Sequence, residues 1–316
     1  MTKRIRIGVA GAGVFGGYHC SKISDLPQAD LAGVFDIDHA RASALAGKNH
    51  TLAATTFQAL LERADAVVIA TPAISHFELA EAALRAGRHV FVEKPVALTT
   101  REASQLIALA QAAGVVLQVG HQERYVAEAA GLFGRDAAPV KVNCVRQTAS
   151  SGRCEDVSVV LDLMIHDIDL IRTLTDAELK SVVATGDAHA VEAELVLTNG
   201  STVMLTASRR SASPERRMNL IYEDGLIEFD FVNRKATNTT PSPLQAQFSD
   251  EDLPLAFRDP LAFGASAFVA AIENKGAPIV PGEDGRRALE WALAIEQAAG
   301  IVGAADQTVA SERLRA

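Results

Sequence analysis

The chain has 316 residues, of which 48% are hydrophobic, and a formal net charge of −9. This length is sufficient for two domains with separate cores. The negative charge, without a basic cluster, argues against a nucleic-acid partner. No apolar run approaches the roughly 20 residues that span a bilayer, so we expect no membrane insertion. Cys20, Cys144 and Cys154 are scattered and odd in number, which predicts reduced thiols in a cytoplasmic protein.

The first predicted strand runs directly into a glycine-rich turn and then a helix. Gly11, Gly13 and Gly16 form the G-x-G-x-x-G pattern of dinucleotide-binding folds. In that pattern the first glycine permits the turn, the second lets a pyrophosphate approach, and the third lets the helix pack against the strand. Free N–H groups at the start of the helix would bind the phosphates. Val14 and Phe15 complete the predicted cofactor loop.

A second predicted strand, residues 31–35, ends at Asp36, about 20 residues beyond the glycine motif. A carboxylate there accepts hydrogen bonds from the 2′-hydroxyl of a ribose and repels a 2′-phosphate. The sequence therefore predicts NAD as the cofactor and makes NADP less favourable, although Arg41 stands one turn further on. The alternative is that Asp36 only caps a turn with Asp38.

Strands and helices alternate up to about residue 119, which predicts a doubly wound parallel sheet. Further strands are predicted at 66–70, 89–92 and 115–119, and a helix at 100–113 that ends at Gly114. Ligands bind such sheets beyond the carboxyl ends of the strands. The candidate ligand residues that follow these ends are Thr71, Pro72 and His76, then Glu93 and Lys94, then His121.

Beyond residue 122 the pattern changes to that of an antiparallel sheet. Asn199-Gly200 predicts a hairpin between its strands. The strands are predicted at 140–148, 181–185, 190–197, 202–208, 218–222 and 226–231, the helices near 157–174, 260–273 and 285–303, and a long loop at 233–255. One face of this sheet needs a cover beyond its own helices, for apolar residues such as Val203 and Leu205 or their alternates. We therefore expect self-association.

The predicted fold class is thus α/β. A Rossmann dinucleotide-binding domain over residues 1–121 precedes an α+β domain with a large open, mostly antiparallel sheet over residues 122–316. The second domain would bind substrate and mediate oligomerisation. Its carboxyl-terminal helices can pack back on the first domain.

The predicted helix 157–174 carries a candidate proton acceptor. Asp162, His166 and Asp169 are spaced by four and three residues, which places them on one helical face. A histidine between carboxylates can take a proton, because the negative neighbours stabilise the imidazolium. One alternative is a hydrogen-bonded or solvated face without catalytic use. A zinc site is the other, but further ligands are not evident in the sequence, so we expect no metal.

Lys94 stands at the end of a predicted parallel strand, near where a nicotinamide lies in this kind of fold. Its ammonium can bond a substrate hydroxyl and stabilise negative charge on the oxygen as hydride leaves the carbon. The alternative is a surface lysine paired with Glu93.

These residues together resemble the Gfo/Idh/MocA oxidoreductases over nearly the whole chain. The resemblance implies a Rossmann domain and a second domain that associates through its sheet as a homodimer or homotetramer. It also implies oxidation of a secondary alcohol of a sugar or cyclitol, with Lys94, Asp162 and His166 catalytic. The residues that carry it are the turn Gly11–Gly16, Asp36, Thr71-Pro72 with His76, Glu93-Lys94-Pro95, residues 120–124, and the pair Asp162 and His166.

Within the family, residues 120–125, 156–169 and 206–209 are similar to UDP-N-acetylglucosamine 3-dehydrogenases, which form a 3-keto sugar nucleotide. Gln122 and Tyr125 depart from that pattern. Guanidinium forks match phosphate oxygens, so arginines near the site are candidate diphosphate ligands. The expected substrate-binding residues are His121, Arg124, Arg146, Arg153, Asp162 and His166, with Arg209 as a further diphosphate candidate.

The sequence thus predicts NAD-dependent oxidation of a sugar or sugar-nucleotide hydroxyl, with UDP-N-acetylglucosamine at C3 as the first candidate. Two alternatives stay open. One is an inositol or free-aldose dehydrogenase, which needs no arginines for phosphates. The other is a dinucleotide-binding regulatory protein without turnover, against which the intact candidate catalytic residues argue.

Overall fold

The computed structural model describes residues 4–149, 156–244 and 253–301. Contacts within the chain define two units, and each is described by itself. The first runs to Gln122 and includes the later segment Asp259–Arg286. The second contains Glu123–Arg258 and the chain from Arg287 onward.

The first unit contains a five-stranded parallel sheet with the strand order β2-β1-β3-β4-β5. This confirms the predicted Rossmann-like sheet. Every residue of the short third strand is buried, as expected for a strand covered on both faces. The strands are β1 (Ile5–Ala10), β2 (Ala29–Phe35), β3 (Ala66–Ile69), β4 (His89–Glu93) and β5 (Leu117–Gly120).

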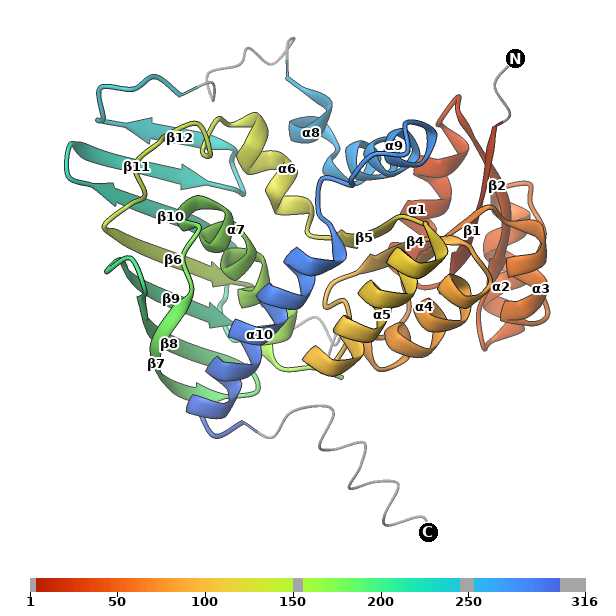
Figure 1. The fold of residues 1–316 in the computed structure, drawn as a ribbon, viewed down its shortest axis with the longest axis horizontal. Coiled ribbons are helices and arrows are strands. Elements are labelled where there is room, and N and C mark those ends of the chain that lie inside the picture. The colour runs from red at the N-terminus through yellow and green to blue at the C-terminus, as the bar shows by residue number, and fades with distance from the viewer. Residues whose placement is uncertain (1–3, 150–155, 245–252, 302–316) are drawn as a thin grey trace. The chain divides into compact units, whose positions relative to one another are not determined.

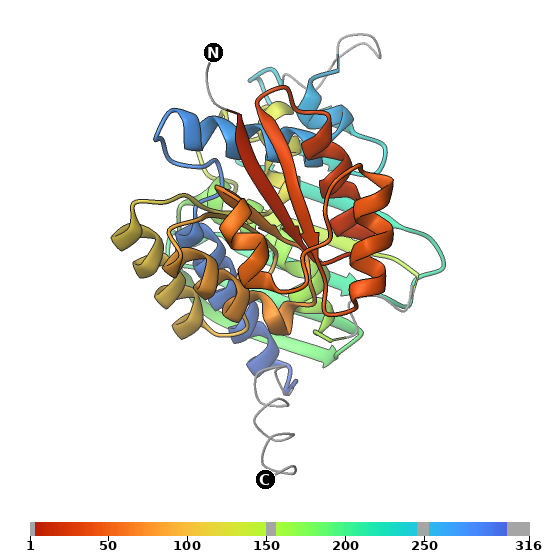
Figure 2. The ribbon, with the colours of Figure 1, turned by 90° about the vertical axis from the view of Figure 1, so that its right-hand side faces the viewer.

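Helices lie on both sides of this sheet (Figure 2). On one face, Val9 packs with Ile23 and with Phe268 in a single hydrophobic core. On the other face, Leu60 lies directly over Gly8, where a Cβ would come within 2.7 Å of the leucine Cγ. The helices are α1 (Val14–Ser24), α2 (His39–Lys48), α3 (Phe57–Arg63), the 3₁₀ turn η1 (Ala73–Ser75), α4 (His76–Arg85), α5 (Thr100–Ala113), α9 (Pro260–Glu273) and the start of α10 (Gly282–Ala298).

Local sequence signals fix the ends of α5. Thr99 accepts a bond from the backbone of Glu102, and the Glu102 carboxylate accepts one from the Thr99 N–H, which forms a capping box. Gly114 ends the helix at φ 62°, in the left-handed region that glycine adopts without strain. The predicted end of this helix is confirmed.

The second unit contains a seven-stranded sheet with the order β12-β11-β10-β6-β9-β8-β7. Among the described strands of this sheet, only the β6–β9 pair is parallel, so the predicted mostly antiparallel sheet is confirmed. The predicted hairpin at Asn199-Gly200 joins β8 to β9. The strands are β6 (Lys141–Gln147), β7 (Leu179–Asp187), β8 (Ala190–Leu197), β9 (Thr202–Ser208), β10 (Glu215–Tyr222), β11 (Gly225–Asp230) and β12 (Lys235–Asn238).

The expectation of one long loop at 233–255 is wrong, because β12 lies within it. This strand pairs with β11 at the edge of the sheet through backbone bonds, and its polar side chains gave no apolar alternation to detect. Val203 and Leu205 of β9 are buried beneath the helical side of the sheet. Their alternates Met204 and Thr206 occupy the opposite face.

Helices α6 and α7 lie over this sheet (Figure 1). The sequence did not predict α6, whose residues 124–127 are all buried. The predicted helix 157–174 is divided, because Val160–Met164 form a π-helical segment before the regular α-helix begins. The elements are α6 (Gln122–Ala129), η2 (Val160–Met164), α7 (Ile165–Thr175), the short α8 (Leu255–Arg258) and the rest of α10.

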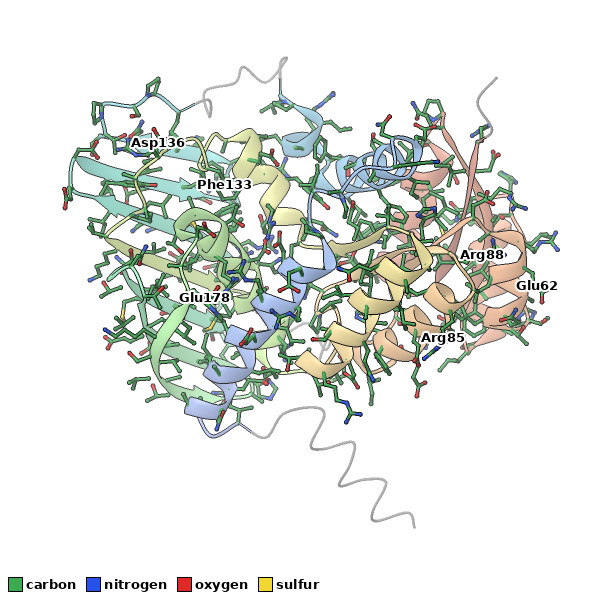
Figure 3. The ribbon with its side chains drawn as sticks, viewed as in Figure 1. Glu62, Arg85, Arg88, Phe133, Asp136 and Glu178 are labelled. Carbon is green, nitrogen blue, oxygen red and sulfur yellow. The ribbon has the colours of Figure 1, made fainter. Side chains whose placement is uncertain are left out.

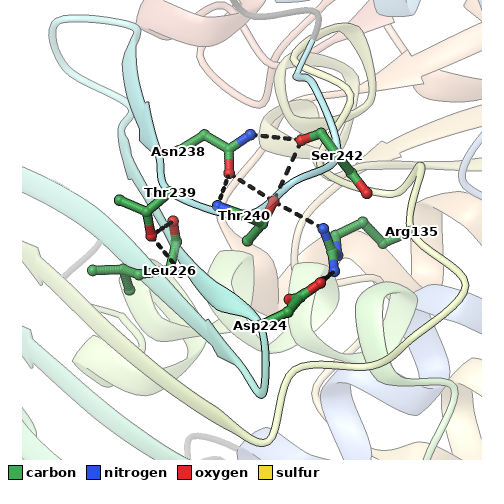
Figure 4. A network of polar contacts seen from close by, with 7 residues as sticks. All are labelled: Arg135, Asp224, Leu226, Asn238, Thr239, Thr240 and Ser242. Carbon is green, nitrogen blue, oxygen red and sulfur yellow. Dashed lines mark hydrogen bonds and ion pairs between the residues drawn. The ribbon is translucent and has the colours of Figure 1, made fainter.

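Ion pairs fasten the periphery of the second unit. Arg135 contacts the Asp224 carboxylate at 2.7 Å and the Thr240 hydroxyl at 2.8 Å (Figure 4). Its guanidinium also lies over the Tyr222 ring, 4.4 Å from the ring centroid. Glu178, marked in Figure 3, accepts hydrogen bonds from two arginines of α7 and α10. These contacts join the β10–β11 hairpin to the following chain, and α7 to α10.

Candidate functional site

The glycine turn after β1 is shaped by two close backbone approaches. At Gly11, φ is +102° and a Cβ would lie 2.5 Å from the Ala70 carbonyl oxygen. At Gly16 a Cβ would lie 1.8 Å from the Gly11 carbonyl oxygen. Around Gly13, the N-cap of α1, a Cβ would meet no other described atom within 4 Å. This open approach to a helix N-terminus fits a pyrophosphate.

The side chains that follow the turn are exposed, as a ligand-facing loop requires. Val14 and Phe15 are 49% and 43% exposed. Tyr18, one turn further along α1, is also exposed and meets the Phe15 ring edge to face, with the ring centroids 6.1 Å apart. Tyr18 was not among the residues predicted from the sequence.

Asp36 joins the end of β2 to the glycine turn. Its Oδ2 accepts a hydrogen bond from the Ala12 N–H at 2.6 Å, and its Oδ1 accepts one from the Asp38 N–H at 2.9 Å. Each carboxylate oxygen has a second lone pair, so these contacts leave acceptor capacity for a ribose hydroxyl. Asp38 caps α2 and pairs with Arg41 at 3.3 Å. Asp36 thus makes the turn contact with Asp38 that the alternative interpretation predicted. It also bonds to Ala12 of the glycine turn.

His76, a predicted cofactor contact, is buried between the loops that follow β3 and β4. Its ring is 1% exposed. Nδ1 lies 2.7 Å from the Pro95 carbonyl oxygen, and Nε2 lies 3.0 Å from the Thr71 carbonyl oxygen. The ring therefore bridges the loops after β3 and β4. The Thr71 hydroxyl accepts a bond from the Ser75 hydroxyl at 2.7 Å.

Glu93 is the last residue of β4, and Lys94 follows it. The Glu93 carboxylate is almost buried, and its Oε1 lies 2.7 Å from His19 Nε2 and 3.0 Å from Gln122 Nε2. Lys94 is partly exposed. Sequence reasoning did not identify His19, although a histidine on the apolar side of α1 is an available signal. His121, after β5, is 1% exposed and so is not an open substrate contact in this structure.

In the second unit, Asp162 and His166 are both partly exposed, whereas Asp169 is 1% exposed. Asp169, predicted on the same helical face, is therefore buried, and its carboxylate accepts a hydrogen bond from Arg124. The π-helical segment η2 contains Asp162 and changes the angular spacing to His166. Such segments are frequent at functional sites.

Three arginines hold the carboxylates of this helical region. Arg209 donates from Nε to Asp162 at 3.1 Å, and its Nη2 donates to the Val157 carbonyl at 3.0 Å. Arg124 forms a two-point pair with Asp169, with Nε at 2.9 Å.

Arg146 of β6 binds Asp167 through two bonds of 2.7 and 3.0 Å and Glu123 at 2.9 Å. Burial raises the pKa of the Asp167 carboxyl, and the Arg146 guanidinium opposes that rise. Arg124 and Arg146 were expected to bind phosphate. They are instead buried and committed to carboxylates, so the geometry gives them a structural role. Arg153 lies outside the described residues.

Other chemical groups of the described ranges are unremarkable. Cys20 and Cys144 are free and buried, and burial raises the pKa of Cys20 to about 12. Within these ranges, His, Cys, Asp and Glu side chains nowhere gather in threes as a metal ion would need. Helices with the length and apolarity of a membrane span are also absent from the part of the chain that the structure describes.

The parallel sheet and the glycine turn are those of a dinucleotide-binding protein. The model of the oxidoreductase family with an NAD-binding Rossmann fold matches residues 5–121, and the model of the GFO/IDH/MocA C-terminal domain matches residues 140–228. UDP-N-acetylglucosamine 3-dehydrogenase of Acidithiobacillus ferrooxidans is 37% identical over 93% of this chain and 97% of that protein. The chain therefore belongs to the Gfo/Idh/MocA oxidoreductase family.

Other relatives extend the likeness. A crystal structure of the Acidithiobacillus ferrooxidans enzyme superimposes with a TM-score of 0.85 at 36% identity, over 93% of this chain and 97% of that chain. Inositol 2-dehydrogenase of Rhizobium meliloti is 27% identical over 91% of this chain and 94% of that protein. The fold is also shared with GenD2 from gentamicin A biosynthesis, at a TM-score of 0.83 and 23% identity over 95% of each chain.

Proposed function

We propose that the protein is an NAD-dependent dehydrogenase of a sugar nucleotide, with UDP-N-acetylglucosamine oxidised at its C3 hydroxyl. The observation that carries this proposal is the 37% identity to UDP-N-acetylglucosamine 3-dehydrogenase over 93% of the chain. The open approach at Gly13 and the carboxylate of Asp36 support NAD as the cofactor. When bound, NAD supplies the acceptor for the hydride.

The residue roles follow from their chemistry. His166 takes the hydroxyl proton, and Lys94 stabilises the negative charge that develops on the same oxygen. Asp162 orients His166 and the sugar. Arg209 holds Asp162 through a hydrogen bond and is itself bonded to the Val157 carbonyl. One C–H bond and one O–H bond of the alcohol break, the carbonyl forms, and the two electrons leave with the hydride.

A second candidate function has its own observation in support. The buried pairs of Arg124 and Arg146 remove two of the arginines expected at a diphosphate. An inositol or free aldose needs no such ligand, and relatives named inositol 2-dehydrogenase align along most of the chain. This function remains the alternative.

The experiment that separates the two is a ligand panel. Wild-type protein with NADH is heated with UDP-N-acetylglucosamine, UDP-glucose, myo-inositol and glucose, because a ligand that binds the folded state raises the melting temperature. Selective stabilisation by UDP-N-acetylglucosamine supports the proposal. Stabilisation by myo-inositol or glucose, without an effect of either sugar nucleotide, supports the alternative.

We also propose self-association through the outer face of the second sheet, as a homodimer or homotetramer. Met204 and Thr206 of β9 lie on this face, and Val196 on β8 is 37% exposed. A second copy would cover it. Light scattering at micromolar concentration should report a multiple of the chain mass. A monomer at every concentration contradicts this proposal.

A further inference from the structure

The chain neighbours of Lys94 each contact a buried histidine. Glu93, before it, contacts His19 of α1, and Pro95, after it, contacts His76 of α4. Both histidine–acceptor distances are 2.7 Å, and the two rings are 0% and 1% exposed. We infer that His19 and His76 are positioning residues for Lys94, which they hold from both sides without contact with substrate.

The His19 ring is fully buried among the described residues. The ring meets Phe91 edge to face at 5.3 Å between centroids, and Phe91 in turn meets Phe268 of α9 at 5.8 Å. Nδ1 has no hydrogen-bond partner among the described residues. The polar interaction of this ring is therefore directed to Glu93, and the aromatic contacts fix its orientation.

The Glu93 carboxylate is likewise confined. Oε1 also accepts a bond from the Gln122 amide at 3.0 Å. A Cβ on Gly120 would lie 2.6 Å from Oε2, so the carboxylate fits here only because residue 120 is glycine. His19, Gln122 and the backbone at Gly120 therefore restrict the position of the carboxylate. This restricts Glu93, the last residue of β4 before Lys94.

His76 restrains the other side of Lys94. Both of its ring nitrogens face carbonyl oxygens, those of Thr71 and Pro95, so the full pair of bonds requires a hydrogen on each nitrogen. The ring thus connects the chain after β3 to the chain after β4.

His19 also connects Lys94 to the cofactor loop. It follows Gly16 on α1 by three residues, about one helical turn. Movement of α1 at the pyrophosphate position would therefore move His19 and, through Glu93, the backbone of Lys94. The structure assigns to this histidine pair the alignment of the lysine with the bound dinucleotide, an assignment that rests on the proposed role of Lys94.

The test compares His19→Gln, His19→Ala, His76→Gln and His76→Ala with His89→Gln. His89 begins β4 and accepts a backbone bond at 2.9 Å, so it is a partly buried histidine at the opposite end of the same strand. UDP-N-acetylglucosamine oxidation is followed with hydroxylamine trapping, and myo-inositol replaces it if the ligand panel selects inositol. NADH fluorescence titration gives the concentration of folded sites, to which kcat is normalised.

We expect the alanine variants to lower kcat by at least about tenfold, since misplacement of a catalytic group by about 1 Å costs up to 10²-fold. Glutamine, which retains a donor, should recover part of that loss, while KM and the NADH Kd stay within a few-fold of wild type. His89→Gln should keep the wild-type kcat. If His19→Ala does not fold, Glu93→Gln takes its place, because it weakens the same contact at constant size.

Two results overturn the inference. One is a kcat in the His19 and His76 variants equal to that of His89→Gln. The other is a change in KM or NADH Kd alone. Lys94→Ala, measured in parallel, separates this failure from that of the proposed function. If Lys94→Ala keeps its activity, the role of the lysine itself is refuted, and the positioning inference with it.

Discussion

Gly16→Ala tests the cofactor loop at its tightest contact. The added Cβ would lie 1.8 Å from the Gly11 carbonyl oxygen, whereas real Cβ contacts essentially never fall below 3.0 Å. Relief of the overlap requires a shift of about 1.2 Å between the start of α1 and the turn. Both atoms belong to or adjoin backbone, so a side-chain rotation cannot relieve it. Overpacking of this kind costs about 1–3 kcal/mol of folding free energy.

The same shift should weaken cofactor binding. A displacement of about 1 Å takes a hydrogen bond of about 2.9 Å beyond its useful range. Loss of one charge-assisted bond of about 1.5–3 kcal/mol corresponds to at least about a tenfold increase in the NADH Kd. Fluorescence titration measures that Kd, and thermal melts without cofactor measure stability.

Gly17→Ala is the matched control. Gly17 lies in the interior of the same helix, α1. Its Cβ would make an ordinary contact of 3.7 Å with Leu45 Cδ1 of α2. Replacement of a helical glycine by alanine should then stabilise the protein by up to about 1 kcal/mol and leave the NADH Kd unchanged. If Gly16→Ala matches Gly17→Ala in both melting temperature and NADH Kd, the argument from the glycine turn is refuted.

The remaining predictions concern specificity, pH and the second unit. Asp36→Ser should narrow the preference for NADH over NADPH, and equal binding of both by the wild type would contradict the assignment of Asp36. Burial lowers the pKa of His89 in the folded state, so folding favours the neutral ring. The contribution of His89 to the free energy of unfolding should therefore be constant above about pH 6.5, the pKa of the unfolded state. It should fall as the pH drops through the lower pKa of the folded state. His89→Gln should remove this pH dependence in urea titrations. Arg209→Lys should lower kcat by roughly tenfold or more, since lysine cannot reach both Asp162 and the Val157 carbonyl; unchanged kinetics would show that Asp162 needs no such support.

Local signals predicted much of the fold. The glycine turn, the helix end at Gly114 and the hairpin at Asn199-Gly200 each depend on a backbone conformation that glycine favours, so they are visible in a few adjacent residues. Strand β12 was missed because an edge strand with polar side chains has little apolar alternation. Helix α6 was missed because it follows β5 almost directly and because one of its buried residues is the charged Arg124.

The candidate site shows the same division. Asp36 and Lys94 follow predicted strand ends, so sequence position was enough to nominate them. The partner of Asp162, by contrast, is Arg209, 47 residues away, and the partner of Glu93 is His19, 74 residues away. Such pairs depend on tertiary structure. Residue type alone suggested phosphate for the arginines, and only the fold shows that buried carboxylates occupy them.

Transfer of deuterium from carbon 3 of the sugar tests the central claim most directly. UDP-N-acetylglucosamine deuterated at C3 is incubated with the protein, NAD and hydroxylamine, which traps the ketone and pulls an unfavourable equilibrium forward. The proposal predicts a trapped sugar nucleotide that has lost this deuterium, and NADH that has gained it, by mass spectrometry. His166→Ala should form both products at least about 10²-fold more slowly. Absence of deuterium from the NADH, together with turnover of myo-inositol or glucose by the same preparation, would contradict the proposed substrate.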